Sequence, residues 1–296
     1  MRVLVIGSAN LDLVYEVERL PAPGETVLAA GSASYAGGKG NNQAVAAVRA
    51  GADTRFIAAL GRDDAGDRLA AEARAAGITL LDRRVDASTG TAAILVDRRG
   101  ENSIVVDSGA NARLTDLSAA EREAVAAADV LVLQLETPLD TVAEAVRVAR
   151  AAGTRVVLNA APAAPVPPPV LRGADVLIVN EHEAAALAGP GADPMTALTA
   201  HGCAVVITLG AGGALVGSPG EDPVPVLSYT VDAVDTTGAG DTFVGAFAAA
   251  LSGDGVEALV AATGFATAAA AISVQRKGAV PSIPTLEEVR EFRDAR

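Results

Sequence analysis

The 296-residue sequence is poor in residues that cross-link a chain or bind metals, with one cysteine, two histidines and no tryptophan. The single thiol, Cys203, cannot form an internal disulfide, so the fold does not depend on an oxidising compartment. His182 and His201 are too few for a histidine-rich metal site. Aromatic residues make up only 3% of the chain and leave little surface on which a nucleoside base could stack.

Basic residues are outnumbered as well, since 23 Lys and Arg stand against 36 Asp and Glu and give a formal net charge of −13. This charge repels polyanions and excludes nucleic acid as the main partner. With 50% hydrophobic residues, the chain buries enough surface to offset the entropy cost of folding, which excludes disorder. What remains is a globular protein, which we expect to be a cytoplasmic enzyme.

Long hydrophobic runs are missing too. The N-terminal run at 3–6 is shorter than the ~7 to 15 residues of a signal-peptide core. The alanine-rich run at 258–272 is shorter than the ~18 residues of a membrane span, so we expect a helix packed in the core. Neither run predicts contact with a membrane.

Short β-branched runs alternate along the chain with alanine-rich stretches, several of which end at a glycine. Strands buried on both faces are predicted at 3–6, 55–59, 130–133, 155–158, 176–179 and 205–208. Helices are predicted at 41–50, 64–76, 139–152, 181–187, 194–201 and 244–251. This alternation is typical of a single α/β domain with a mostly parallel sheet and right-handed crossovers.

Two segments, 11–35 and 90–107, depart from that alternation and have the pattern of antiparallel strands outside the main sheet. In the second, a hairpin turns at 97–100. We expect the two segments to form a small β-lid over the carboxyl ends of the parallel strands, where open α/β sheets bind ligands.

The strongest motif is Asp-Thr-Thr-Gly-Ala-Gly-Asp-Thr-Phe at 235–243, directly before a predicted helix. Its glycines let successive N–H groups point at one spot at the positive end of that helix, which suits an anion. Asp241 would compete with this anion if it were only a cap, whereas a base that accepts a proton from a hydroxyl belongs there. The alternative is an aspartate N-cap on a glycine-rich loop.

A second glycine cluster, at 36–44, enters the predicted helix at 41–50. Lys39 and Asn42 offer hydrogen-bond donors for a polyhydroxylated ligand, although a solvated lysine at a helix entry has the same pattern. Asn10 and Asp12 lie two residues apart at the end of the first strand, so their side chains face the same way and suit adjacent sugar hydroxyls. A turn containing Asn and Asp is the alternative there.

Two further polar segments, 180–183 and 208–213, follow predicted strands at the ligand edge of the sheet. A carboxylate in the first could organise Mg²⁺ through water, and the glycine turn of the second could cradle a nucleotide. Helix capping and turn formation are the alternative interpretations of these two segments.

Taken together and in this order, these segments resemble the ribokinase-like (PfkB) family of carbohydrate kinases over nearly the whole chain. Further matching segments are 7–12, 23–26, 108–112, 134–138 and 276–282. The resemblance implies a three-layer α/β/α fold with a mostly parallel central sheet and a small β-lid. It also implies ATP-dependent transfer of the γ-phosphoryl group to the 5-hydroxyl of D-ribose, which gives ribose 5-phosphate.

The resemblance assigns roles to individual residues. Asp241 would be the catalytic base, and the backbone N–H groups of Gly238, Ala239 and Gly240 would hold the developing negative charge. The implied sugar-binding positions are Asn10, Leu11, Asp12, Gly38, Lys39, Gly40, Asn41, Asn42, Glu136 and Asp241. The implied nucleotide-binding positions are Asn180, Thr208, Leu209, Gly210, Ala211, Gly212, Gly213, Gly240, Asp241 and Thr267. Glu183 would organise Mg²⁺ through water, and the positions implied for an activating K⁺ are Asp235, Thr237, Ser273, Arg276, Gly278 and Ser282.

Other functions and an oligomeric state follow from the same resemblance. A different kinase of the family would phosphorylate 2-deoxyribose, fructose or adenosine, but Asn10 with Asp12 favours vicinal hydroxyls and the scarcity of aromatics disfavours a nucleoside. A non-catalytic sugar sensor would have lost the chemistry, whereas Asp241 and the glycine turn before it are intact. The lid of the family often pairs two subunits, so we expect a homodimer formed through the β-lid.

Overall fold

A computed structural model of the chain describes residues 1–295. Its strands are β1 (Arg2–Ile6), β2 (Asn10–Glu16), β3 (Gly31–Gly37), β4 (Asp53–Gly61), β5 (Thr79–Val85), β6 (Gly90–Val96), β7 (Asn102–Asp107), β8 (Val130–Leu133), β9 (Arg155–Asn159), β10 (Val176–Asn180), β11 (Ala204–Thr208), β12 (Ala214–Gly217) and β13 (Val224–Val226). Its α-helices are α1 (Lys39–Arg49), α2 (Asp64–Ala75), α3 (Ala119–Ala127), α4 (Leu139–Ala152), α5 (Pro168–Gly173), α6 (Glu181–Ala188), α7 (Pro194–Thr199), α8 (Ala239–Ala250), α9 (Gly255–Ser273), α10 (Ala279–Ser282) and α11 (Leu286–Asp294). Two short 3-10 helices are η1 (Gly109–Arg113) and η2 (Gly210–Gly212).

The main sheet has nine strands in the order β13-β12-β11-β10-β9-β8-β1-β4-β5. All pairs from β11 to β5 are parallel, and β12 and β13 join the β11 edge in antiparallel fashion. In β1, Val3 and Val5 enter the core on one face, while Leu4 and Ile6 enter the core on the other. Because alternate side chains of a strand point to opposite faces, an unbroken apolar run is what a doubly covered strand requires.

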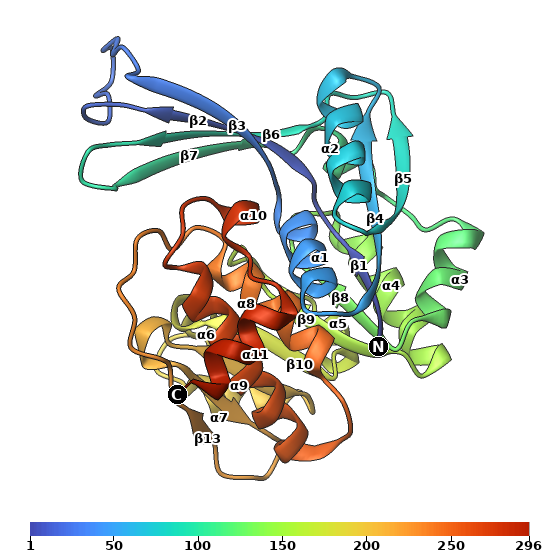
Figure 1. Ribbon diagram of the computed structural model, residues 1–296. Helices are drawn as coiled ribbons and strands as arrows, with labels where there is room; N and C mark the ends of the chain where they lie inside the picture. Colours follow the sequence, from blue (N-terminus) through green and yellow to red (C-terminus); the bar gives the residue numbers. More distant parts are fainter. Residues whose placement is uncertain (296) are drawn as a thin grey trace.

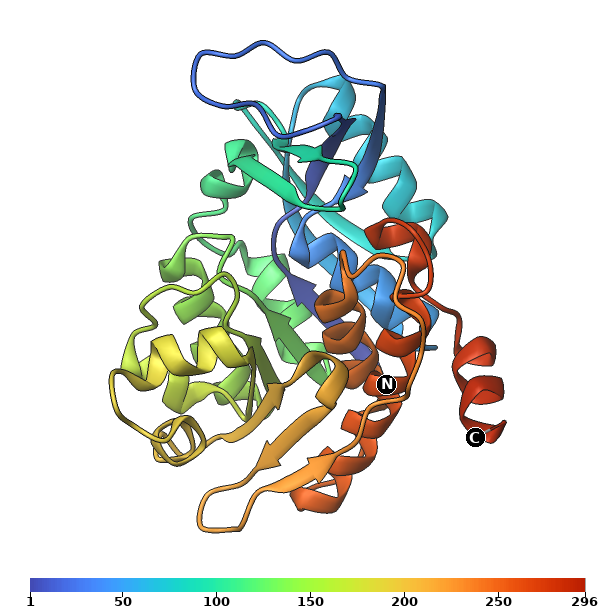
Figure 2. The ribbon, with the colours of Figure 1, turned by 90° about the vertical axis from the view of Figure 1, so that its left-hand side faces the viewer.

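Helices cover both faces of this sheet (Figures 1 and 2). Buried side chains of α1, α2, α8, α9 and α11 form the core on one face, and those of α3 to α7 form the core on the other. The expected three-layer arrangement with a mostly parallel sheet is confirmed.

Helix α9 corrects one expectation. It runs over 19 residues, Gly255–Ser273, so it extends past the predicted run at both ends and is long and apolar enough to cross a membrane by length and composition. The expectation that this apolar segment is shorter than a membrane span was therefore wrong. Its packing supports the core position, because Ala262, Phe265 and Ala266 are buried in the same core as Phe247 of α8.

The predicted lid is a separate four-stranded sheet in the order β3-β2-β6-β7, which projects from one end of the body (Figure 1). The two hairpins, β2 with β3 and β6 with β7, are antiparallel as expected. The hairpins join through a parallel pairing of β2 with β6, which the expectation of antiparallel strands missed. Residues 17–30 form a connection between β2 and β3, because Pro21 and Pro23 have no N–H group to donate to a strand ladder.

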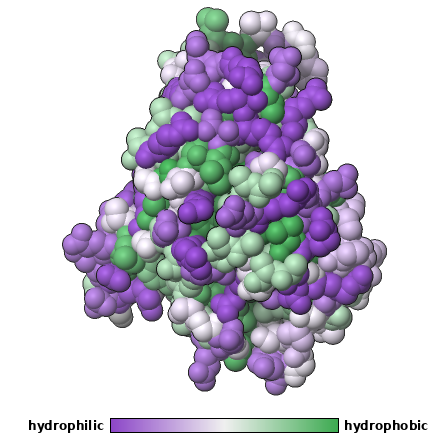
Figure 3. Space-filling model, turned by 90° about the vertical axis from the view of Figure 1, so that its right-hand side faces the viewer, coloured by the Kyte–Doolittle hydropathy of each residue, from purple (hydrophilic) through white to green (hydrophobic). Residues whose placement is uncertain are grey.

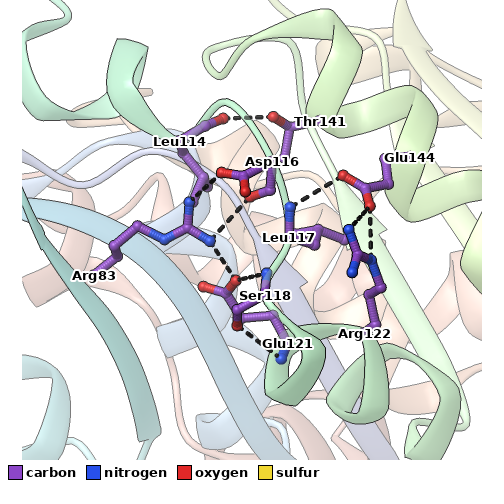
Figure 4. A network of polar contacts seen from close by, with 9 residues as sticks. All are labelled: Arg83, Leu114, Asp116, Leu117, Ser118, Glu121, Arg122, Thr141 and Glu144. Carbon is purple, nitrogen blue, oxygen red and sulfur yellow. Dashed lines mark hydrogen bonds and ion pairs between the residues drawn. The ribbon is translucent and has the colours of Figure 1, made fainter.

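A polar network fixes the segment that leads from the lid back into the body (Figure 4). Arg83 of β5 donates to Asp116 at 2.8 Å and to Glu121 of α3. Arg122 of α3 pairs with Glu144 of α4 at 2.6 Å. These contacts tie α3 and the residues after η1 to both β5 and α4. The same side of the molecule carries mostly hydrophilic surface around smaller apolar areas (Figure 3).

Candidate active site

Glycines let α1 begin in direct contact with the chain that leaves β1. Gly38 has a φ of +87°, and a Cβ on it would lie 2.9 Å from the Cα of Ala9 and from the backbone nitrogen of Asn10. A Cβ on Gly40 would lie 2.6 Å from the carbonyl carbon of Gly7. Only glycine is compatible with this conformation at 38 and with both of these approaches. The first turn of α1, with Lys39, is thereby placed beside the carboxyl end of β1.

Helices α1 and α8 pack closely because α8 carries a glycine at the contact. A Cβ on Gly245 would lie 2.3 Å from the Gln43 carbonyl oxygen. Across this contact, Asn42 Nδ2 donates to Asp241 Oδ2 at 3.0 Å and Gln43 Nε2 donates to Asp241 Oδ1 at 2.9 Å. Each carboxylate oxygen of Asp241 therefore has an amide donor from α1.

One lysine, Lys39, lies among the carboxylates around Asp241. Burial raises the pKa of Asp241, although the positive charge of Lys39 and the two amide hydrogen bonds act in the opposite direction. Burial lowers the pKa of Lys39, but the charges of Asp241, Glu136 and Glu183 outweigh burial and leave that pKa raised. Lys39 thus stays protonated beside a carboxyl group whose raised pKa suits it to accept a proton.

Three of the expected sugar-binding residues, Asn10, Leu11 and Asp12, belong to the lid. Asn10 and Asp12 are in β2, a lid strand, rather than at the end of β1. Burial and the charges of Glu136 and Asp241 raise the pKa of Asp12 to about 7. Glu136 accepts hydrogen bonds from Ser8 Oγ at 2.5 Å and from the backbone nitrogen of Lys39 at 3.2 Å.

The orientation of Asn10 is set by a residue to which the sequence assigned no role. Asn111 Nδ2 donates to Asn10 Oδ1 at 2.7 Å, and Asn111 Oδ1 accepts from the backbone nitrogen of Ala9 at 3.0 Å. Since the Asn10 oxygen is used in this way, its amide nitrogen is the group left for a ligand. Asn111 lies in η1, so it joins the start of β2 to the segment that follows β7.

A pocket of about 160 Å³ joins the expected catalytic and nucleotide-binding positions. Its lining residues are Lys39, Asn159, Ala161, Ile178, Val179, Asn180, Glu183, Thr208, Gly238, Gly240, Asp241 and Val244. They come from the starts of α1, α6 and α8 and from the carboxyl ends of β9, β10 and β11, the edge of the sheet at which a ligand site was expected.

The first turn of α8 leaves room at Gly240. Apart from its chain neighbours and the backbone of its own helix, a Cβ on Gly240 would meet no atom of residues 1–295 within 4 Å, and no positive φ forces glycine there, so neither packing nor backbone conformation requires it. Gly238 has a φ of +74° and packs against Ala279. The N–H of Ala239, one of the three N–H groups expected to bind the anion, instead donates to the Thr236 carbonyl at 3.2 Å.

The expected nucleotide positions are divided between the pocket and its surroundings. Asn180 caps α6, and its own N–H donates to Glu183 Oε2 at 2.9 Å, which fixes that carboxylate at the pocket wall. Thr208 lines the pocket, while residues 209–213 continue from it into the exposed turn η2. Thr267 is not in the pocket wall: it is buried in α9, and its hydroxyl donates to the Thr263 carbonyl at 2.8 Å.

Asn41 lies elsewhere as well. It lines a different cavity, of about 300 Å³, together with Val45 and Arg49 of the same helix. Lys39, Asn42 and Gln43 share one face of α1, and the residues at 41, 45 and 49 share another, because positions four apart lie on the same side of a helix. Asn41 therefore lies on a different face of α1 from Lys39, and its expected sugar contact stays a prediction.

The positions expected to hold a monovalent cation are partly brought together. Asp235 accepts from the N–H groups of Thr237 at 2.9 Å and Gly278 at 2.8 Å, so it ties the loop before α8 to the loop before α10. Burial acts to raise the pKa of Asp235, but these hydrogen bonds and the charge of Lys277 leave it lowered. The remaining positions are engaged locally: the hydroxyls of Ser273 and Ser282 donate to carbonyls of their own segments, and Arg276 pairs with Glu288.

Gln43 is the site residue that the sequence leaves without a role. It is fully buried and contacts Asp241, Asn159 and Gln134. Helical spacing was the available signal, because Gln43 follows Lys39 by four positions and therefore shares its face of α1.

The chain is similar to known proteins over nearly its whole length. The family model described as pfkB family carbohydrate kinase matches residues 1–286. The ribokinase of Haemophilus influenzae is 41% identical over 299 residues, which cover 97% of each chain. The bifunctional ribokinase/ribose-5-phosphate isomerase A of Fructilactobacillus sanfranciscensis is 37% identical over 300 residues, and this chain spans 55% of its length. The structure of Arabidopsis thaliana ribokinase complexed with ribose and ATP matches with a TM-score of 0.90 and 35% identity, covering 98% of this chain and 97% of that one.

Proposed function

The chain belongs to the pfkB family of carbohydrate kinases, and we propose that it transfers the γ-phosphoryl group of ATP to the 5-hydroxyl of D-ribose, giving ribose 5-phosphate and ADP. The name of the Haemophilus relative and the ribose and ATP in the Arabidopsis structure support this choice of substrates. The observation that carries the proposal is the position of Asp241, beside Lys39 in the pocket that also contains Asn180, Glu183 and Thr208.

Asp241 acts as the general base. It accepts the proton of the 5-hydroxyl as that oxygen bonds to the γ-phosphorus and the bond to the β-phosphate oxygen breaks. Phosphoryl transfer requires mainly positioning and charge stabilisation from the protein, so a single base is sufficient. Lys39, the start of α8 and the N–H groups of Gly238 and Gly240 stabilise the negative charge of the transferring group.

The sugar lies between the lid and the body in this proposal. Asn10, Asp12 and Glu136 surround the hydroxyls that are not phosphorylated, together with Lys39 and Asn42 of α1. Asn42 supports this placement, because its Oδ1 is buried and has no hydrogen-bond partner within the described chain. Such an oxygen is suited to a donor hydroxyl from a ligand. The nucleotide lies at Asn180, Thr208 and the turn that follows Thr208.

Magnesium would be held through Glu183. Within residues 1–295 no group of three or more His, Cys, Asp or Glu side chains is placed to hold a metal ion. Mg²⁺ at phosphoryl-transfer sites needs only one or two carboxylates, because phosphates and water complete its shell. Glu183 fits this requirement, since it lines the pocket and only one of its oxygens is used by the cap of α6. The bound ion would neutralise phosphate charge.

A potassium ion would be held by the loops that Asp235 ties together. The lowered pKa of Asp235 keeps its carboxylate ionised, and the loops around it offer backbone carbonyls, so the donor set fits a monovalent cation. The positions proposed for this ion are Asp235, Thr237, Ser273, Arg276, Gly278 and Ser282. The ion would order the turn that carries Gly238.

We also propose a cytoplasmic homodimer paired through the lid. β7 is an edge strand of the lid, and Ile104, Val105 and Val106 are 51%, 67% and 52% exposed. An exposed apolar edge strand is suited to cover by a second chain. Sedimentation equilibrium of the purified protein tests this state.

An ADP-release assay tests the proposed function. It is run over ribose, 2-deoxyribose, fructose and adenosine, with and without K⁺. We expect the highest kcat/KM with ribose. ADP release with another acceptor only would reassign the substrate within the family, and saturable sugar binding without ADP release would make the protein a sensor.

A further inference from the structure

We propose that Gln43 is a positioning residue of this kinase: it holds one oxygen of Asp241 in place permanently, so that the other oxygen faces the sugar hydroxyl. The proposal rests on the proposed function, because it assigns to Gln43 a part in the reaction that Asp241 performs. No motif in the sequence indicates this role, and the side chain does not line the pocket.

The contacts of Gln43 fix the direction of its amide. Its Nε2 donates to Asp241 Oδ1 at 2.9 Å and to Asn159 Oδ1 at 3.0 Å. Its Oε1 accepts from Gln134 Nε2 at 2.7 Å. Asn159 is itself held, because its Nδ2 donates to the Ile178 carbonyl at 3.1 Å. With the oxygen of Gln43 occupied by Gln134, its nitrogen can only point toward the two acceptors.

The side-chain amides of Asn42 and Gln43 differ in whether a bound ligand can change their hydrogen bonds. Asn42 has a buried Oδ1 without a partner in the described chain, and its hydrogen bond to Asp241 Oδ2 is 3.0 Å long. A sugar hydroxyl can therefore recruit the Asn42 amide. Gln43 is 0% exposed and both ends of its amide are occupied, so it keeps its bonds when a sugar enters.

This difference assigns the two oxygens of Asp241. Oδ1 stays bonded to Gln43, while Oδ2 exchanges the Asn42 amide for the substrate hydroxyl. The O–H bond of the hydroxyl then breaks as the proton moves to Oδ2, and its oxygen bonds to the γ-phosphorus as the bond to ADP breaks. A neutral donor at Oδ1 also stabilises the ionised form of the base, which burial disfavours.

The test compares Gln43→Met with the wild-type enzyme in full kinetics of ribose phosphorylation against pH. Methionine has a similar length and fills the buried space, but it cannot donate to Oδ1. We expect the acid limb of the kcat profile to move up by about one pH unit, because the lost bond favoured the charged form. We expect the plateau kcat to fall by about 10-fold or more through lost alignment, with a KM for ribose within about threefold of wild type.

Two further variants keep the test decisive. Gln43→Glu preserves an acceptor for Gln134 and places a second carboxyl beside Oδ1, so its acid limb should move higher than that of Gln43→Met. It replaces Gln43→Met if the latter does not fold. Thr154→Val is the matched control, since Thr154 is 4% exposed and its hydroxyl donates to the Val125 carbonyl at 2.9 Å, at the opposite edge of the sheet. It should lose stability and keep the wild-type pH profile.

The outcomes separate this proposal from the proposed function. An acid limb and plateau kcat that match the wild type in the folded Gln43 variants overturn the role of Gln43. So does a fall in kcat that Thr154→Val reproduces at an equal loss of stability. A wild-type enzyme that phosphorylates another sugar and not ribose overturns the proposed substrate, and the Gln43 variants are then measured with that sugar.

Discussion

The side-chain amide of Asn42 donates to Oδ2 of Asp241 at 3.0 Å, although 199 positions of the chain separate the two residues. The contact exists because the first turns of α1 and α8 meet where Gly245 allows the helices to approach. The base is thus held by donors of α1. Productive binding then exchanges one hydrogen-bond partner and leaves the helices in place.

Asp241→Asn should remove catalysis and preserve binding. The amide has the size of the carboxyl group but cannot accept the hydroxyl proton, so we expect kcat to fall by about 10²–10⁴-fold. Ribose affinity, measured by calorimetry, should stay close to that of wild type. Turnover at the wild-type level in this variant would remove Asp241 from the mechanism.

Gly240→Ala should preserve the stability of the fold and impair the anion site. The added methyl meets no atom within 4 Å, so we expect stability to stay equal or rise by up to about 1 kcal/mol. The methyl occupies space where the transferring phosphoryl group would lie, so kcat/KM for ATP should fall by about 10-fold or more. Gly264→Ala in α9, also in open space, is the control and should keep full activity. Equal activity of both variants would contradict an anion site at Gly240.

Asp12 should make the stability of the ligand-free protein depend on pH. Its pKa is raised to about 7 by burial and by the charges of Glu136 and Asp241. A carboxyl group with a raised pKa binds its proton more tightly in the folded state, so its stabilising contribution is complete below its ordinary pKa and is lost as the pH rises through about 7.

The measurement is urea denaturation of the wild type and Asp12→Asn between about pH 4 and about pH 8. The wild-type free energy of unfolding should fall relative to that of the variant by a few kcal/mol at most, on the order of the full shift. Asp86→Asn, an exposed aspartate, serves as control. A difference that does not change across this range would show that Asp12 is not perturbed.

Glu183→Gln should weaken the response to magnesium and leave α6 intact. Glutamine keeps an oxygen that can accept from the Asn180 N–H, so the start of the helix is preserved. The lost charge should raise the Mg²⁺ concentration needed for half-maximal activity, measured at fixed ATP. The exposed neighbour Glu181→Gln should behave as wild type. An unchanged magnesium dependence in Glu183→Gln would exclude this carboxylate as a ligand.

Removal of K⁺ should lower turnover. Activity is measured in K⁺ and in tetramethylammonium, which is too large for the loops around Asp235, with ATP and Mg²⁺ fixed. We expect a several-fold higher kcat in K⁺ and a smaller ratio in Asp235→Asn. Equal rates in the two cations would count against a cation site.

The sequence predicted the strands that are buried on both faces, because their apolar runs do not depend on which neighbours cover them. It missed β5, whose central residues Asp82, Arg83 and Arg84 are charged. β5 is the edge of the sheet, and these charges are satisfied by partners such as Arg74 of α2 and Glu121 of α3. The charged residues of β5 are compatible with a strand only because those helices supply their partners, which the sequence of β5 alone does not show.

Some features of the site could also be predicted from the sequence, and others could not. The glycine clusters could be predicted, since tight turns before helices restrict the residue types allowed. Helical spacing could place Gln43 on the same face of α1 as Lys39, but its role could not be predicted, because the partners that give it that role, Asn159 and Asp241, lie 116 and 198 positions away. The resemblance assigned both Asn41 and Asn42 to the sugar, and the sequence alone does not show that they face different sides of α1, because one residue along a helix turns a side chain by about 100°.

The parallel pairing of β2 with β6 has a consequence for folding. β2 ends at Glu16 and β6 begins at Gly90, so their pairing closes a loop that contains β3, α1, β4, α2 and β5. Closing this loop costs chain entropy. The cost is smaller when the enclosed elements have already docked, because they then shorten the distance between β2 and β6. Docking of these elements in the body therefore favours the pairing of β2 with β6, and with it the assembly of the strand that carries Asn10 and Asp12.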